Sequence, residues 1–87
     1  MSQVYRVTIA PTAQKFIDRK APHNMRARLQ AACEGLGVDP RPYGYIKLEG
    51  RDTYRIREGD YRIEYRINDK DVAVDVIEVE HRKNMYK

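Results

Sequence analysis

The chain has 87 residues, of which 41% are hydrophobic and 34% are charged, with seventeen Lys and Arg residues against thirteen Asp and Glu residues. Natural domains cluster near about 100–150 residues, so we predict a single domain over residues 1–87. The composition is too apolar for a disordered chain, and no run approaches the ~20 apolar residues of a membrane span. The formal net charge of +4 predicts an anionic partner.

The cysteine content and the first residues indicate the compartment. Cys33 is the only cysteine, which excludes an intrachain disulfide, and no apolar segment of signal-peptide length follows Met1. Both observations favour a reducing cytoplasm. Cys33 lies on an apolar helical stripe and is predicted to be a core residue. Because His23 and His81 are far apart in the sequence, no zinc site is expected, and we predict neither a metal nor a cofactor.

The first half of the chain predicts one strand followed by two helices. Apolar and polar residues alternate over residues 3–9, which is typical of a strand with one buried side. Pro11 suits the first turn of a helix that runs to Lys20. Pro22 disfavours a helical conformation at Ala21, the residue before it, and so ends this helix. A second helix follows at once and pairs with the first as an antiparallel hairpin. Its apolar stripe consists of Met25, Leu29, Ala32, Cys33 and Leu36.

The second half predicts antiparallel strands. Residues 37–45 have the proline and glycine content of a loop. We expect a short strand near 45–48, a hairpin over about 53–67, and a last strand over 72–79 that is apolar on both faces, as in the middle of a sheet. The element order predicts an α+β fold of the form β-α-α-β-β-β(-β), in which the helix hairpin covers one face of an antiparallel sheet.

The predicted hairpin carries the most informative pattern. Apolar and charged residues alternate on both sides of the turn at Gly59-Asp60. Because successive strand side chains point to opposite faces, the apolar set can pack on a core while the charged set faces outward. Guanidinium groups grip phosphate oxygens two at a time, so this open face is interpreted as a phosphate-binding surface. Its candidate residues are Arg55, Arg57, Arg62 and Arg66, with Arg51 in the turn before them.

The alternative is a solvated sheet face on which arginines pair with carboxylates across strands. Glu58, Asp60 and Glu64 are available for such pairs, and the pattern alone favours neither interpretation. Asp75 and Glu78 are too isolated in the pattern to predict a catalytic carboxylate pair.

The basic segment after the last strand favours a ligand. This segment should emerge beside the edge of the sheet that carries the arginine face. It supplies an imidazole from His81, a guanidinium from Arg82 and a phenol from Tyr86. Metal-free RNA cleavage requires proton transfer and stabilisation of a phosphorane, which such groups provide. A histidine beside a strand end is more often structural, and a terminal tyrosine either stacks on a base or packs the C-terminus. Further candidate phosphate contacts in this segment are Lys83 and Lys87.

The chain resembles a known family over nearly its whole length, and two motifs are the most specific parts of the resemblance. The hairpin Tyr54-Arg55-Ile56-Arg57-Glu58-Gly59-Asp60-Tyr61-Arg62 and the ending His81-Arg82…Tyr86 are similar to the RelE/ParE superfamily of toxin–antitoxin toxins. The resemblance implies a compact α+β toxin that, in the RelE branch, cuts ribosome-bound mRNA by 2′-hydroxyl attack without a metal. It also implies a hetero-oligomer with a cognate antitoxin. The ParE branch instead inhibits DNA gyrase, and that alternative stays open, as does a weakly active or non-catalytic homologue that acts by binding.

The resemblance also implies residue roles. Arg62 falls on the arginine that stabilises the phosphate, and RelE has lysines at the two hairpin positions where this chain has arginines. Because an arginine does not readily lose its proton, proton transfer is expected to fall to His81 or Tyr86. Carried over position by position, the family's basic and phenolic residues correspond to Arg55, Arg57, Arg62, Arg82 and Tyr86.

Overall fold

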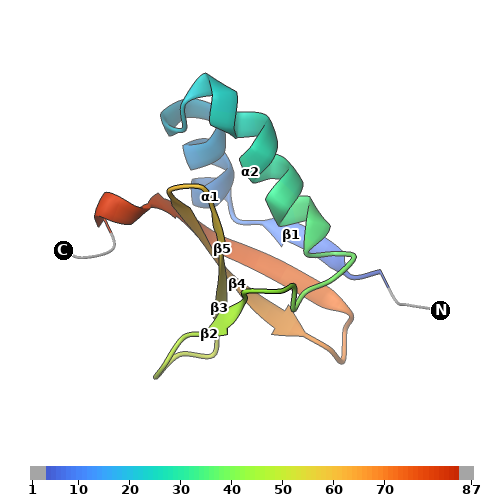
Figure 1. Ribbon diagram of the computed structural model, residues 1–87. Coiled ribbons are helices and arrows are strands. Elements are labelled where there is room, and N and C mark those ends of the chain that lie inside the picture. The colour runs from blue at the N-terminus through green and yellow to red at the C-terminus, as the bar shows by residue number, and fades with distance from the viewer. Residues whose placement is uncertain (1–3, 85–87) are drawn as a thin grey trace.

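The computed structural model describes residues 4–84 and has the α+β architecture that the sequence predicted. A five-stranded sheet forms one layer, and the helices pack against one of its faces (Figure 1). Within the described range, no helix is long and apolar enough to cross a bilayer. In chain order the elements are β1 (Arg6–Ile9), α1 (Pro11–Lys15), the π-helical segment η1 (Phe16–Lys20), α2 (His23–Gly35), β2 (Ile46–Lys47), β3 (Tyr54–Glu58), β4 (Tyr61–Asn68), β5 (Ala73–His81) and the 3₁₀ turn η2 (Arg82–Asn84).

The sheet has the strand order β1-β5-β4-β3-β2. Strands β2 to β5 pair antiparallel, as predicted. β1 pairs parallel to β5, with Arg6 opposite Ala73 and Ile9 opposite Val76, so the sheet is mixed where the sequence predicted antiparallel pairs throughout. The reason is that the chain reverses direction from one element to the next, and an even number of reversals separates β5 from β1. β5 lies between β1 and β4, as its two apolar faces indicated.

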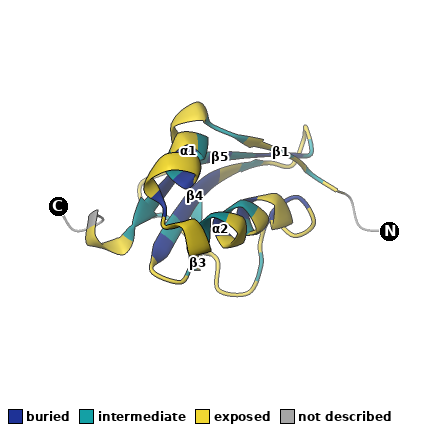
Figure 2. Ribbon diagram, turned by 90° about the horizontal axis from the view of Figure 1, so that it is seen from above, coloured by how far each residue is buried: buried dark blue, intermediate teal, exposed yellow. Residues whose placement is uncertain are grey.

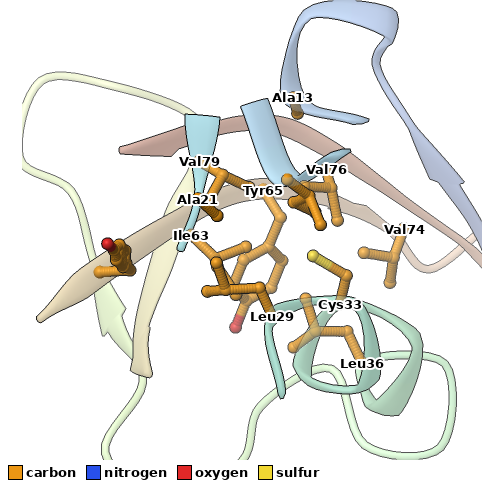
Figure 3. Close-up of a cluster of buried hydrophobic side chains, with 12 residues drawn as sticks. Ala13, Ala21, Leu29, Cys33, Leu36, Ile63, Tyr65, Val74, Val76 and Val79 are labelled. Carbon is orange, nitrogen blue, oxygen red and sulfur yellow. The ribbon is translucent and has the colours of Figure 1, made fainter. Parts of the chain in front are cut away.

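The core lies between the helices and the sheet. Leu29 and Cys33 of α2 are fully buried, and they face the sheet residues Ile63, Tyr65 and Val74 (Figure 3). Figure 2 shows the same division, with the buried residues along β4 and the exposed ones on the outer side of α1. Burying a large aliphatic side chain stabilises the fold by about 1.5–3 kcal/mol. The core therefore fixes which face of each strand is covered and leaves the other face open.

Gly37 allows the loop after α2 to pass close to β1. A Cβ atom at Gly37 would lie 2.7 Å from the carbonyl oxygen of Tyr5 and 3.1 Å from Cγ2 of Val7. We expect Gly37→Ala to lower the free energy of unfolding by roughly 1–3 kcal/mol, the usual cost of overpacking, in urea unfolding followed by circular dichroism. The matched control is Gly35→Ala, because a Cβ atom there meets nothing within 4 Å. Equal stability of the two variants would contradict this account.

Cys33 is a core residue, as predicted, and its thiol is chemically protected. Burial raises the pKa of the Cys33 thiol from 9.0 to about 12. Because only the thiolate is nucleophilic, we expect a disulfide reagent at pH 8 to label the native protein far more slowly than the urea-unfolded chain. A group with a raised folded pKa contributes stability that is complete below its unfolded pKa, so this contribution should be lost between about pH 9 and pH 12. Rapid native-state labelling, or an unchanged alkaline profile in Cys33→Ala, would contradict the assignment.

Candidate nucleic-acid interface

The β3–β4 hairpin places three predicted arginines on one face. Gly59 has φ +60° in the turn, a conformation that glycine adopts without strain. In the register that follows, Arg57 lies opposite Arg62 and Arg55 lies opposite Glu64. Directly opposite residues share a face of the sheet. Ile63, the residue next to Arg62 in β4, points into the core. Because successive side chains alternate between faces, these arginines lie on the face turned away from the helices.

The same rows continue onto β5. Glu80 lies opposite Arg62, and Glu78 lies opposite Glu64. The open surface therefore mixes cations with carboxylates, and it is not the purely basic face that the hairpin alone suggested. We call this surface the outer face, and its residues are Arg51, Arg55, Arg57, Arg62, Glu64, Glu78 and Glu80.

Part of the outer face is paired internally, as the sequence-based alternative proposed. Arg51 donates through Nη1 to both carboxylate oxygens of Glu64, at 3.2 Å and 3.4 Å. The Thr53 hydroxyl donates to Glu64 Oε2 at 2.8 Å. Glu64 is only 6% exposed, so these donors compensate the burial of its charge. Arg51 is therefore held as a structural ion pair at the margin of the face.

Of the other two carboxylates predicted to pair with arginines, Glu58 serves a different surface. Arg28 of α2 donates to Glu58 Oε2 through Nη2 at 2.8 Å and through Nε at 3.1 Å. Glu58 thus lies on the helix side of the sheet and ties α2 to β3. It does not neutralise the outer face.

Glu78 has a carboxylate neighbour, Glu80, on the same face of β5. A hydrogen bond with Glu80, followed by burial and repulsion from the same carboxylate, raises the pKa of Glu78 above its ordinary value, while Arg62 and Arg51 act to lower it. The prediction that Glu78 is isolated was therefore wrong. The signal was available, because residues two apart in a strand share a face.

His81 lies on the opposite face from the arginines. β5 extends through His81, and His81 pairs with Tyr61, whose side chain is buried under the helices. The two rings meet edge to face, with centroids 5.0 Å apart. The imidazole Nδ1 accepts a hydrogen bond from the backbone N–H of Lys83 at 3.1 Å. The prediction that His81 joins the arginine surface is thus wrong.

A bulge in β5 explains why His81 faces the helices and not the outer face. Tyr65 pairs with Val76 and Glu64 pairs with Glu78, so Ile77 is an extra residue on β5. An extra residue reverses the alternation of every side chain beyond it. Val79 and His81 therefore face the helices, and the carboxylates between and before them face outward.

Arg82 is anchored to the turn of the hairpin. Its backbone N–H donates to the Asp60 carbonyl at 2.8 Å, and its Nε lies 3.5 Å from Asp60 Oδ1. Asp60 thus forms the ion pair that the alternative interpretation anticipated, although both partners are more than 60% exposed. Lys83 follows at the surface, whereas Tyr86 and Lys87 lie outside the described residues. Among residues 4–84 there is no group of three potential metal ligands.

Comparison with known proteins gives the family. The model for the ParE toxin of type II toxin–antitoxin systems, parDE, matches residues 7–86. The chain belongs to the RelE/ParE toxin family. Toxin RelG of Mycobacterium tuberculosis is 30% identical over 84 residues, which cover 95% of this chain and 97% of RelG.

Solved RelE structures share the fold of this RelE/ParE toxin. In the archaeal RelE–RelB complex from Pyrococcus horikoshii, the matching chain is 33% identical with a TM-score of 0.78, and the match covers 94% of this chain and 97% of that one. In the intact E. coli RelBE toxin–antitoxin complex, the values are 30% identity, a TM-score of 0.72, and coverage of 88% and 95%. The predicted family and fold are therefore confirmed, while the residue roles remain predictions.

Proposed function

We propose that this RelE/ParE toxin is a ribosome-dependent endoribonuclease that cleaves mRNA by attack of a 2′-hydroxyl on the adjacent phosphate. The supporting observation is the pair Arg57 and Arg62, directly opposite each other on the open face. Like charges in that position repel each other, and an anion bound between them relieves the repulsion. A phosphodiester relieves the repulsion and fits the two guanidinium forks.

The two arginines have a defined task in this reaction. During attack the phosphate becomes a phosphorane that carries additional negative charge on its oxygens. Fixed donors aimed at those oxygens stabilise the transition state more than the ground state. Arg62 is half-buried in the strand and well placed to hold the phosphate, while Arg57 is exposed and can reach the flanking backbone. Arg82 and Lys83 lie in η2, where Arg82 contacts the turn of the hairpin, and they extend the positive surface along the message.

We also propose that a cognate antitoxin neutralises the toxin in a hetero-oligomer. The relatives from P. horikoshii and E. coli were solved as complexes with RelB. The positive net charge of this chain suits an antitoxin with an acidic amphipathic helix. That helix would wrap around the toxin's helices and sheet edge and cover the basic segment that follows β5.

A second candidate function is inhibition of DNA gyrase, which the ParE name of the matching family model favours. This function requires binding to a protein and no RNA cleavage.

A translation extract with a defined message separates the two functions. We expect discrete new 5′-ends within ribosome-occupied codons, mapped by primer extension, and an uncut message when ribosomes are left out. A message with a 2′-deoxynucleotide at the cleaved position should resist cleavage there, because the attacking hydroxyl is missing. An intact message, together with double-strand DNA breaks in cells that express the toxin, would overturn the nuclease proposal and support gyrase as the target.

A further inference from the structure

The proposed nuclease requires a group that takes the proton of the 2′-hydroxyl. The arginines of the outer face do not serve, because a guanidinium keeps its proton at any working pH. His81 lies on the helix side of the sheet, edge to face with Tyr61. Tyr86 lies outside the described residues, so within residues 4–84 the base is sought among the other side chains beside Arg62.

Glu80 lies directly opposite Arg62 on the outer face. Opposite side chains in an antiparallel pair have Cβ atoms about 4.5–5.5 Å apart. A phosphate bound by the Arg62 guanidinium therefore places its attacking ribose within reach of the Glu80 carboxylate. Glu80 is half-buried, which limits its contact with water.

Glu78 lies on the same face of β5 as Glu80, two residues before it. The neighbouring Glu80 carboxylate and partial burial raise the pKa of Glu78 above its ordinary value. Glu78 is therefore the second carboxylate beside Arg62 that the test below must separate from Glu80.

Space for part of the substrate adjoins the two glutamates from the helix side. A cavity of about 380 Å³ opens at the edge of β5, along the half of the strand that continues past the end of β1. Its opposite wall is formed by α1 and η1 and carries Lys15, Phe16 and Lys20. Two ammonium groups and an aromatic ring suit the phosphates and a base of an RNA strand.

We propose that Glu80 is the general base of the cleavage reaction, an inference that rests on the proposed nuclease function. The Glu80 carboxylate takes the 2′-hydroxyl proton while the 2′-oxygen forms a bond to phosphorus. The bond from phosphorus to the 5′-oxygen breaks, and that oxygen takes a proton from water. The products are a 2′,3′-cyclic phosphate and a 5′-hydroxyl, and the protonated Glu80 returns its proton to the hydroxide formed from that water.

Charged groups surround Glu80 on three sides. Arginines lie on β4, on β3 and in the turn before β3, a buried carboxylate lies on β4, and lysines lie across the cavity. These groups are Arg62, Glu64, Arg51, Arg55, Arg57, Lys15 and Lys20.

The test is the pH dependence of single-turnover mRNA cleavage on programmed ribosomes. Glu80→Gln keeps the shape of the side chain and should lower the cleavage rate about 10²–10⁴-fold, the usual contribution of a general base. It should also abolish the fall in rate on the acid side. Glu78→Gln should keep the acid limb, because Glu80 is still present to take the proton. The matched control is Asp75→Asn, also on the outward side of β5 but opposite Arg66, and it should match the wild type.

The outcomes distinguish this inference from the proposed function. If the wild type cleaves and Glu80→Gln cleaves at the same rate with the same acid limb, Glu80 is not the base and the nuclease proposal survives. If the wild type leaves every ribosome-bound message intact, both proposals are overturned. Should Glu80→Gln unfold, the Glu78→Gln profile decides, since loss of the acid limb in that variant would assign the proton transfer to Glu78 and contradict the proposal.

Discussion

Arg62→Ala should reduce ribosome-dependent mRNA cleavage roughly 10²–10³-fold, the effect of removing one fixed donor from a developing oxyanion. The side chain lies on the outer face, between Arg57 on one strand and Glu80 on the other, so its loss leaves the core intact. Cleavage rates on programmed ribosomes and growth after induction measure the effect. Arg19→Ala removes the same charge from an exposed position on η1 and should remain fully toxic. Equal growth arrest by both variants would exclude Arg62 from the site.

Two companion variants show how the guanidinium acts. Arg62→Lys retains the charge and loses the planar fork, so partial activity would indicate a point charge and full loss would indicate bidentate binding. If Arg57 and Arg62 hold the same phosphate, the double alanine variant should lose less activity than the product of the two single losses. Independent losses would place the two side chains on separate phosphates.

Leu29→Ala should lower the free energy of unfolding by about 2–5 kcal/mol, the usual cost of a cavity at a buried leucine. Leu29 is fully buried and points from α2 toward Ile63 and Tyr65 (Figure 3). Total stabilities of small domains are only about 5–15 kcal/mol, so this loss is a large fraction of the total. Val38→Ala is the control, because Val38 is 69% exposed. Similar urea midpoints for the two variants would contradict the core assignment.

The hairpin was predictable because its pattern is unambiguous. Each apolar residue from Tyr54 to Ile56 and from Tyr61 to Ile67 is flanked by a charged or polar one, so only one assignment of faces buries the apolar set. The structure places Arg55, Arg57 and Arg62 as that alternation requires. The β2 strand and the central position of β5 followed from equally local signals.

The placement of His81 was not predictable in the same way. The run Val74 to Val79 includes Val76 and Ile77 side by side, so both alternations bury apolar residues and the pattern does not reveal which residue is extra. Long-range pairs are also invisible to local patterns. The bond from Arg51 to Glu64 spans thirteen residues and depends on the register of the hairpin.

The bulge at Ile77 determines which face the side chains at the end of β5 occupy. With the extra residue, the carboxylates of Glu78 and Glu80 lie on the outer face; without it, the imidazole of His81 would lie there. Deleting Ile77 would turn the end of the strand over, drive Glu78 and Glu80 beneath the helices, and bring His81 out beside the arginines. An insertion or deletion, with no change in the identity of any other side chain, thus decides whether carboxylates or an imidazole accompany the arginines on the outer face.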